Sequence, residues 1–112
     1  MELIYLPKIE SPADLRKISV DELPILAKEL RHVICEQVKE GGGHLAPNLG
    51  VVELTIALHY VFDFAHDRLL FDVGHQCYTH KLLTGRFPLL SKLRQRGGMS
   101  GFPNPDESPY DL

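Results

Sequence analysis

Residues 68–75 of this chain read RLLFDVGH, a short apolar run that closes on a glycine and a histidine. A largely apolar run of this length is typical of a strand that is buried on both faces of a parallel sheet. We therefore predict a strand over 68–74, ended by Gly74, and a histidine turn and helix over 75–85. Because parallel strands are connected through helices, the expected fold class is α/β.

The residues that precede this run predict two helices. Apolar side chains recur at helical spacing through 19–40, which indicates an amphipathic helix there. Its start fits a capping box at Ser19–Glu22. Three glycines end this helix and open a Gly/His loop over 41–50. A second helix is expected over 49–62, with Asn48 as its N-cap.

The two ends of the chain are expected to be less regular. Ser11 and Pro12 predict a short helix within an otherwise extended lead-in, and another short helix is expected over 88–95. Glycine and proline recur without periodicity over 97–112, which predicts a loop. One strand and a few helices do not complete a parallel sheet, so we expect 1–112 to be the opening part of a longer protein.

Composition excludes several classes of protein. The 112 residues are 44% hydrophobic and 24% charged, as in a folded globular domain rather than a disordered chain. A net charge of −3 argues against binding to nucleic-acid phosphates, and two cysteines do not form a disulfide scaffold. No apolar run approaches the roughly 20 residues of a membrane span. The first residues lack the basic segment of a signal peptide, so none is predicted. We expect a cytoplasmic protein without nucleic-acid or membrane partners.

The first candidate site is the loop GGGHLAPNLG at 41–50, which contains His44. Glycines let the backbone approach a ligand closely, and backbone N–H groups at a helix start favour anions such as phosphate. This arrangement makes His44 a candidate functional residue. The alternative is a plain linker between two helices, with His44 as a surface residue.

The second candidate is His75, at the end of the predicted strand. Ligands of α/β proteins bind at the carboxyl ends of strands, and an imidazole there can donate a hydrogen bond or move a proton. The alternative is a capping turn in which backbone groups satisfy His75. Cys77 and His80 would complete a set of zinc ligands, but positions 75 and 77 point to different helix faces, so we predict no metal site.

The remaining histidines and cysteines are assigned to packing or to the surface. Cys35 and Cys77 are expected to be packed as small apolar residues. His32 and His59 lie on predicted helices and are expected to pack in the interior or at an interface. His66 stands between aspartates in a polar segment, which indicates a solvated loop.

Two long segments carry a resemblance to a known family. Residues 43–61 read GHLAPNLGVVELTIALHYV and residues 71–86 read FDVGHQCYTHKLLTGR. Both are similar to the N-terminal region of the 1-deoxy-D-xylulose-5-phosphate synthase family, and the resemblance extends from about residue 11 to residue 112. It implies that 1–112 is the N-terminal part of a transketolase-like, parallel-sheet domain that binds thiamine diphosphate.

The resemblance also implies an activity. The family uses thiamine diphosphate and Mg²⁺ to condense pyruvate with D-glyceraldehyde 3-phosphate with loss of CO₂, and the product feeds isoprenoid, thiamine and pyridoxal synthesis. His44 matches the family's catalytic histidine, which assists proton transfer, and His75 matches the histidine that contacts the cofactor. The family's Mg²⁺ ligands lie outside this chain, so the 112 residues alone are expected to be inactive. The complete protein is expected to be a homodimer.

Two alternatives to the synthase remain at this point. The chain resembles, less closely, the front part of a transketolase N-terminal subunit, although the segment DVGHQ at 72–76 favours the synthase. The other alternative is a non-catalytic module that assembles with a partner chain.

Overall fold

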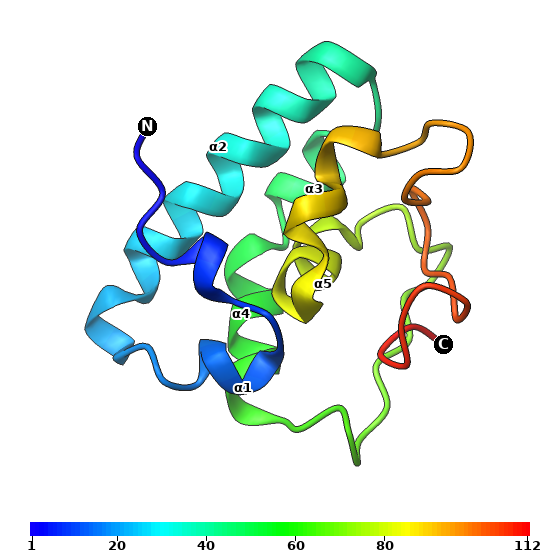
Figure 1. Cartoon of the computed structure of the whole chain (residues 1–112). Helices are drawn as coiled ribbons and strands as arrows, with labels where there is room; N and C mark the ends of the chain where they lie inside the picture. Colours follow the sequence, from blue (N-terminus) through cyan, green and yellow to red (C-terminus); the bar gives the residue numbers. More distant parts are fainter.

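Helix α2 (Leu23–Gly41) forms one side of the molecule, and the other elements pack against it (Figure 1). The computed structural model describes all residues, 1–112. One face of α2 is buried and comprises Leu26, Ala27, Glu29, Leu30, Val33 and Ile34. This spacing confirms the amphipathic helix predicted over 19–40. The capping box is wrong, because Val20–Glu22 form a 3-10 turn and Ser19 makes no side-chain capping bond.

The helix predicted over 49–62 is two helices, α3 (Ala46–Leu49) and α4 (Val52–Val61). The chain breaks between them at Val51, whose backbone angles (φ −122°, ψ 16°) are not helical. Helix α4 packs on α2, and an ion pair between Arg31 and Glu53 joins the two helices at the surface.

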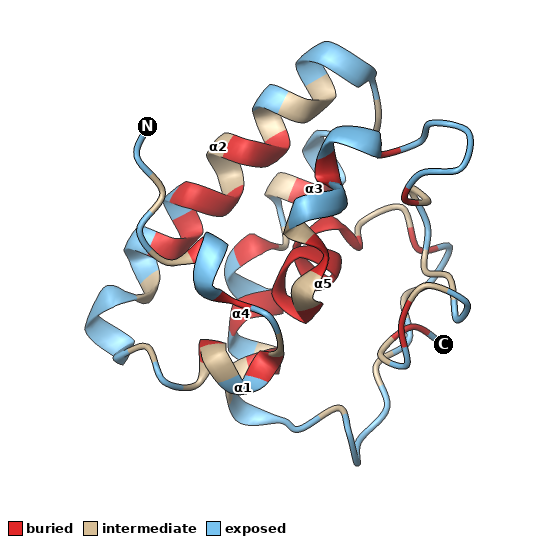
Figure 2. Cartoon of the chain, in the orientation of Figure 1, coloured by how far each residue is buried: buried red, intermediate tan, exposed pale blue.

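The centre of the molecule is occupied by α5 (Tyr78–Lys81), which continues into a π-helical turn at Leu82–Arg86. Figure 2 shows this segment as the largest continuous stretch of buried chain. The structure thus confirms a turn and helix over 75–85, with the helix beginning at Tyr78. The short helix predicted over 88–95 is a 3-10 turn at Phe87–Lys92.

The strand predicted over 68–74 is wrong, and the chain contains no strand. The one backbone–backbone hydrogen bond within this run joins the N–H of Gly74 to the carbonyl of Asp72 at 2.7 Å. Leu70 and Val73 are 71% and 73% exposed. A strand of a parallel sheet needs neighbours for its backbone groups, and this chain supplies none, so the run follows an irregular path. The observed fold is helical rather than α/β.

The ends of the chain pack onto opposite sides of the helical centre. The N-terminal segment contains a 3-10 turn at Leu6–Lys8 and helix α1 (Pro12–Leu15). It is fixed by Glu29 of α2, whose carboxylate accepts a hydrogen bond from the N–H of Leu6 at 3.0 Å. Residues 97–112 contain no helix or strand, as predicted, and run along the far side of the molecule from α2 (Figure 1).

The chain is closely packed although it lacks a sheet. Its radius of gyration is 12.9 Å, close to the value of about 13 Å expected for a compact domain of this length. One cluster of 17 buried apolar residues forms the core. No helix combines the length and the apolar character that crossing a membrane would require.

Two glycines give a matched test of this packing. Both have positive φ, 94° at Gly85 and 75° at Gly97, but a Cβ at Gly85 would lie 2.2 Å from the Glu10 carbonyl oxygen whereas a Cβ at Gly97 would meet nothing. We expect Gly97→Ala to lower the free energy of unfolding by about 1 kcal/mol, from backbone strain. Gly85→Ala should lower it by a further ~1–3 kcal/mol, from the clash. Urea denaturation measures both, and equal losses would contradict the packing of residue 10 on this turn.

Candidate functional site

His44 lies on the turn between α2 and α3. The turn begins where α2 ends, at Gly42 and Gly43, whose φ angles are 76° and 134°. The predicted anion site at a helix start is not supported, because α3 has four residues and the longer α4 begins only at Val52. A helix dipole strong enough to bind an anion needs several aligned turns. His44 is therefore presented by a glycine turn.

His75 lies on the turn before α5 and faces His44. The two ring centroids are 5.1 Å apart and the planes are nearly perpendicular, at 80°. Phe102, from the loop 97–112, places its ring 6.0 Å from that of His44, also edge to face. The structure thus brings together both histidines that the sequence predicts to be functional, from segments about thirty residues apart, together with an aromatic residue that it did not predict.

The two histidines line an open pocket of about 390 Å³. Its other lining residues are Gly43, Pro47, Val73 and Phe102. His44 Nε2 is shielded from solvent and has no hydrogen-bond partner. Since buried polar atoms in proteins are nearly always bonded, this nitrogen is available to a ligand group.

Glycine is required on both histidine turns because other segments approach them closely. A Cβ at Gly43 would lie 2.8 Å from the Tyr78 hydroxyl, and one at Gly74 would lie 2.5 Å from Pro103 Cδ. Both positions also have positive φ. Any larger residue would displace the turn and the histidine that follows it.

Asn48 is fully buried, and its side chain bonds both histidine turns. Nδ2 donates to the carbonyl oxygens of His44 at 2.6 Å and His75 at 2.9 Å, while Oδ1 accepts from the N–H of Tyr78 at 2.8 Å. The predicted N-cap role is wrong, because Asn48 is inside α3 and no side chain caps α4. Sequence reasoning missed the bridge because two of its partners lie 27 and 30 residues away.

Comparison with known proteins connects this arrangement to a family. The sequence profile described as 1-deoxy-D-xylulose-5-phosphate synthase matches residues 6–112. The chain belongs to this synthase family. The resemblance carried by residues 43–61 and 71–86 is thereby confirmed.

Several named relatives agree with this assignment. The 1-deoxy-D-xylulose-5-phosphate synthase of Leptothrix cholodnii is 60% identical over 95% of this chain, and that of Cupriavidus metallidurans is 59% identical over 99% of it. The synthase of Dictyoglomus turgidum is 58% identical over 96% of the chain. The chain spans only 17–18% of the length of these relatives, at their N-terminal end.

In this member of the synthase family, a buried carboxylate fixes the loop that carries Phe102. Asp111 accepts two hydrogen bonds from Arg86, each at 2.7 Å, and lies 3.0 Å from His80 Nε2. It also accepts the backbone N–H of Asn104 at 2.8 Å. Burial by itself would raise the pKa of Asp111, but the bonds from Arg86 and His80 outweigh it and hold that pKa well below its usual range.

A second carboxylate fixes the other end of the same loop. Glu107 accepts from the fully buried Lys81 at 2.8 Å and from the backbone N–H of Ser100 at 2.7 Å. Lys81 also donates to the Ser100 carbonyl at 2.7 Å. Phe102 therefore stands between two anchored points, Ser100 and Asn104, beside the histidine pocket.

His59 extends this network into the core, as the packing prediction for this residue implied. It is fully buried on α4, and its Nε2 lies 2.9 Å from His80 Nδ1. His59 Nδ1 has no partner. The pKa of His59 is lowered to about 3, mainly by burial and to a smaller extent by the nearby His80 and Arg16. His59 is thus held neutral at physiological pH.

The residues considered as zinc ligands do not converge. His80 is engaged with Asp111 and His59, and burial raises the pKa of the Cys77 thiol to about 11. The Cys77 thiol donates weakly to the Gly101 carbonyl at 3.8 Å. No group of three or more His, Cys, Asp or Glu side chains in the chain is arranged to hold a metal ion.

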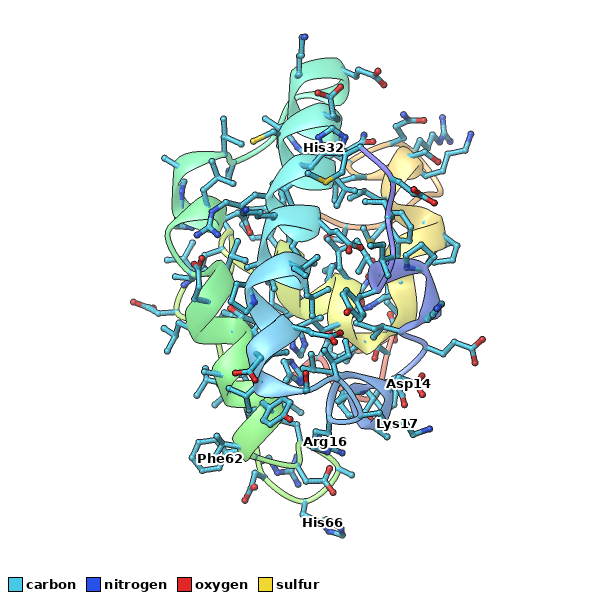
Figure 3. All side chains as sticks on the ribbon, turned by 90° about the vertical axis from the view of Figure 1, so that its left-hand side faces the viewer. Asp14, Arg16, Lys17, His32, Phe62 and His66 are labelled. Carbon is cyan, nitrogen blue, oxygen red and sulfur yellow. The ribbon has the colours of Figure 1, made fainter.

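The other predicted packing and surface residues are placed as follows. Cys77 is buried, as predicted, while Cys35 is only half-buried at the edge of the core. His66 is exposed on the loop after α4, as predicted, and His32 is half-buried on α2. Figure 3 shows His32 and His66 toward opposite ends of the molecule.

His59 predicts how stability depends on pH. The pKa of His59 falls from its usual 6.5 to about 3 on folding, so in the range between these values the unfolded chain binds the proton more readily. The contribution of His59 to the free energy of unfolding is therefore complete above about pH 7 and is lost as the pH falls toward 3. We expect the free energy of unfolding to fall by roughly 1 kcal/mol per pH unit between pH 6 and 4.

Denaturation midpoints measured across this pH range test the prediction. His59→Gln keeps a group that can bond His80 but does not titrate, so this slope should be much shallower in the variant. The exposed His66→Gln provides the matched control and should leave the slope unchanged. An unchanged slope in His59→Gln would contradict the assignment.

Proposed function

We propose that this chain forms the histidine-bearing wall of the cofactor site in a 1-deoxy-D-xylulose-5-phosphate synthase. The complete enzyme would condense pyruvate with D-glyceraldehyde 3-phosphate, releasing CO₂, to supply isoprenoid, thiamine and pyridoxal synthesis. The observation that carries the proposal is the meeting of His44 and His75 at one pocket in a chain of this family. The profile match and the named relatives favour the synthase over the transketolase alternative.

The residues that line this pocket suit one part of a binding site for thiamine diphosphate. The pocket of about 390 Å³ lies within the range of roughly 300–1,000 Å³ found for small-molecule sites. It offers imidazole and aromatic surfaces together with the unpartnered His44 Nε2. When bound, thiamine diphosphate supplies the nucleophilic carbon and the electron sink that decarboxylation requires.

The two histidines have different roles in this proposal. His44 acts as the catalytic residue, because a shielded nitrogen without a protein partner can hold a proton and transfer it to a reacting oxygen. His75 binds and orients the cofactor through its ring, which also lines the pocket. Phe102, whose ring lies edge to face against that of His44, helps to exclude water from the pocket.

The remaining features of the proposal concern the longer protein. We assign the Mg²⁺ ligands to residues beyond this chain, as the family resemblance implies. The parallel-sheet domain implied by the family resemblance would likewise need strands that this chain does not contain. The proposal includes a homodimer, as the resemblance implies, and a cytoplasmic location, as the sequence composition predicts.

Histidine substitutions in a full-length synthase that contains these residues test the assigned roles. We expect His44→Asn to lower kcat about 10²–10⁴-fold, through loss of proton transfer, with little change in cofactor affinity. His75→Asn should raise the Kd for thiamine diphosphate about tenfold or more, through loss of a contact. Steady-state kinetics and calorimetric titration measure the two effects.

His66→Asn is the matched control, because that histidine is exposed and does not line the pocket. It should change neither kcat nor Kd. Wild-type kcat in His44→Asn together with wild-type Kd in His75→Asn would refute the proposed roles.

The 112-residue chain itself provides a separate test. Titration of the chain with thiamine diphosphate should show no saturable, Mg²⁺-dependent binding, because the proposal assigns the metal ligands to other parts of the longer protein. A full-length synthase titrated under the same conditions should bind the cofactor. Saturable Mg²⁺-dependent binding to the chain alone would show that the metal ligands were wrongly assigned.

A further inference from the structure

The two histidine turns depend on one side chain for their relative position. Neither His44 nor His75 lies inside a helix, and each follows a glycine with positive φ. Glycine lets the backbone of such a turn adopt many conformations, so packing or hydrogen bonds must select one of them. The amide of Asn48 bonds the carbonyl oxygens of both residues directly.

Every hydrogen-bonding group of the Asn48 side chain has a defined partner. A primary amide has two N–H donors, and here one reaches the His44 carbonyl and the other the His75 carbonyl. Its oxygen accepts from the first N–H of α5, that of Tyr78. Aspartate, although it has the same shape, donates to neither carbonyl when ionised and to only one of them when protonated.

Tyr78 closes the arrangement from the other side. Its hydroxyl accepts the backbone N–H of His44 at 3.2 Å, while its own N–H donates to Asn48. The backbone of His44 is thus held at both its N–H and its C=O by two residues that are bonded to each other. Both of these residues are almost completely buried, so water does not compete for the bonds.

We propose that Asn48 is a positioning residue of the synthase, which sets His44 and His75 at the separation that the shared pocket requires. The inference rests on the proposed function, and it assigns Asn48 no contact with cofactor or substrate. Asn48 acts through the two histidines. Its loss should therefore impair proton transfer and cofactor binding together, whereas loss of either histidine impairs one of them.

Asn48→Asp in a full-length synthase that contains these residues tests the inference. The measurements are kcat, the Kd for thiamine diphosphate by calorimetry, and both again in the His44→Asn and His75→Asn backgrounds. Gln95→Glu is the matched control, since it makes the same amide-to-carboxylate change on an exposed side chain that does not line the pocket.

We expect Asn48→Asp to lower kcat about tenfold or more and to raise Kd about tenfold or more, because two buried carbonyls lose their donor. Residues that act through a common partner give non-additive effects. The kcat effect should therefore disappear in the His44→Asn background, and the Kd effect should disappear in the His75→Asn background. Gln95→Glu should change neither quantity.

A milder variant covers the case in which Asn48→Asp fails to fold, as judged by circular dichroism and gel filtration. Tyr78→Phe removes only the hydroxyl that accepts the His44 N–H. It should lower kcat several-fold, leave Kd unchanged and have no further effect in the His44→Asn background.

Two outcomes overturn the inference, and they can be told apart. In the first outcome, Asn48→Asp and Tyr78→Phe change kcat or Kd by the same factor in the histidine variants as in the enzyme that retains both histidines. Asn48 and Tyr78 would then act only on general stability, while the proposed function would stand. Unchanged kcat in His44→Asn and unchanged Kd in His75→Asn would overturn the proposed function and this inference with it.

Discussion

The second half of the molecule depends on a buried carboxylate, Asp111, and on the cationic and histidine side chains around it. Beyond α4 the chain has no sheet, and outside the helical segment 78–92 regular backbone hydrogen bonding does not define its path. Asp111 instead connects Arg86 and His80, in the central helical segment, to the backbone of Asn104. This connection holds the loop 97–112 against the core and places Phe102 beside His44.

A cluster of this kind contributes more to a defined arrangement than to net stability. Removing charges from water offsets much of the attraction between them, unless every group is bonded. Here both oxygens of Asp111 and both oxygens of Glu107 accept hydrogen bonds, but the buried Arg86 Nε has no partner, so the desolvation is compensated only in part. Any other position of the loop 97–112 would leave these buried charges without partners, and such positions are therefore strongly disfavoured.

The parts of the structure that sequence reasoning predicted are those fixed by local patterns. The spacing of apolar residues determines α2, the glycines at 41–43 end it, and the Gly- and Pro-rich end forms a loop. The prediction of a strand over 68–74 is wrong because a strand needs neighbouring strands to pair with, and a run of apolar residues does not supply them. Asn48 and Asp111 could not be assigned because two of the partners of each lie more than twenty residues away. The local sequence pattern makes the two histidines candidates and the family resemblance gives their roles, while their approach to one pocket is a property of the fold.

The central claim is that His44 and His75 face one bound cofactor, with Asn48 bridging their backbones. A crystal structure of a full-length synthase containing these residues, in complex with thiamine diphosphate and Mg²⁺, tests this claim most directly. The account predicts that both imidazole rings contact the cofactor and that the Asn48 amide bonds both histidine carbonyls. A cofactor bound at a site that neither histidine touches would contradict the account.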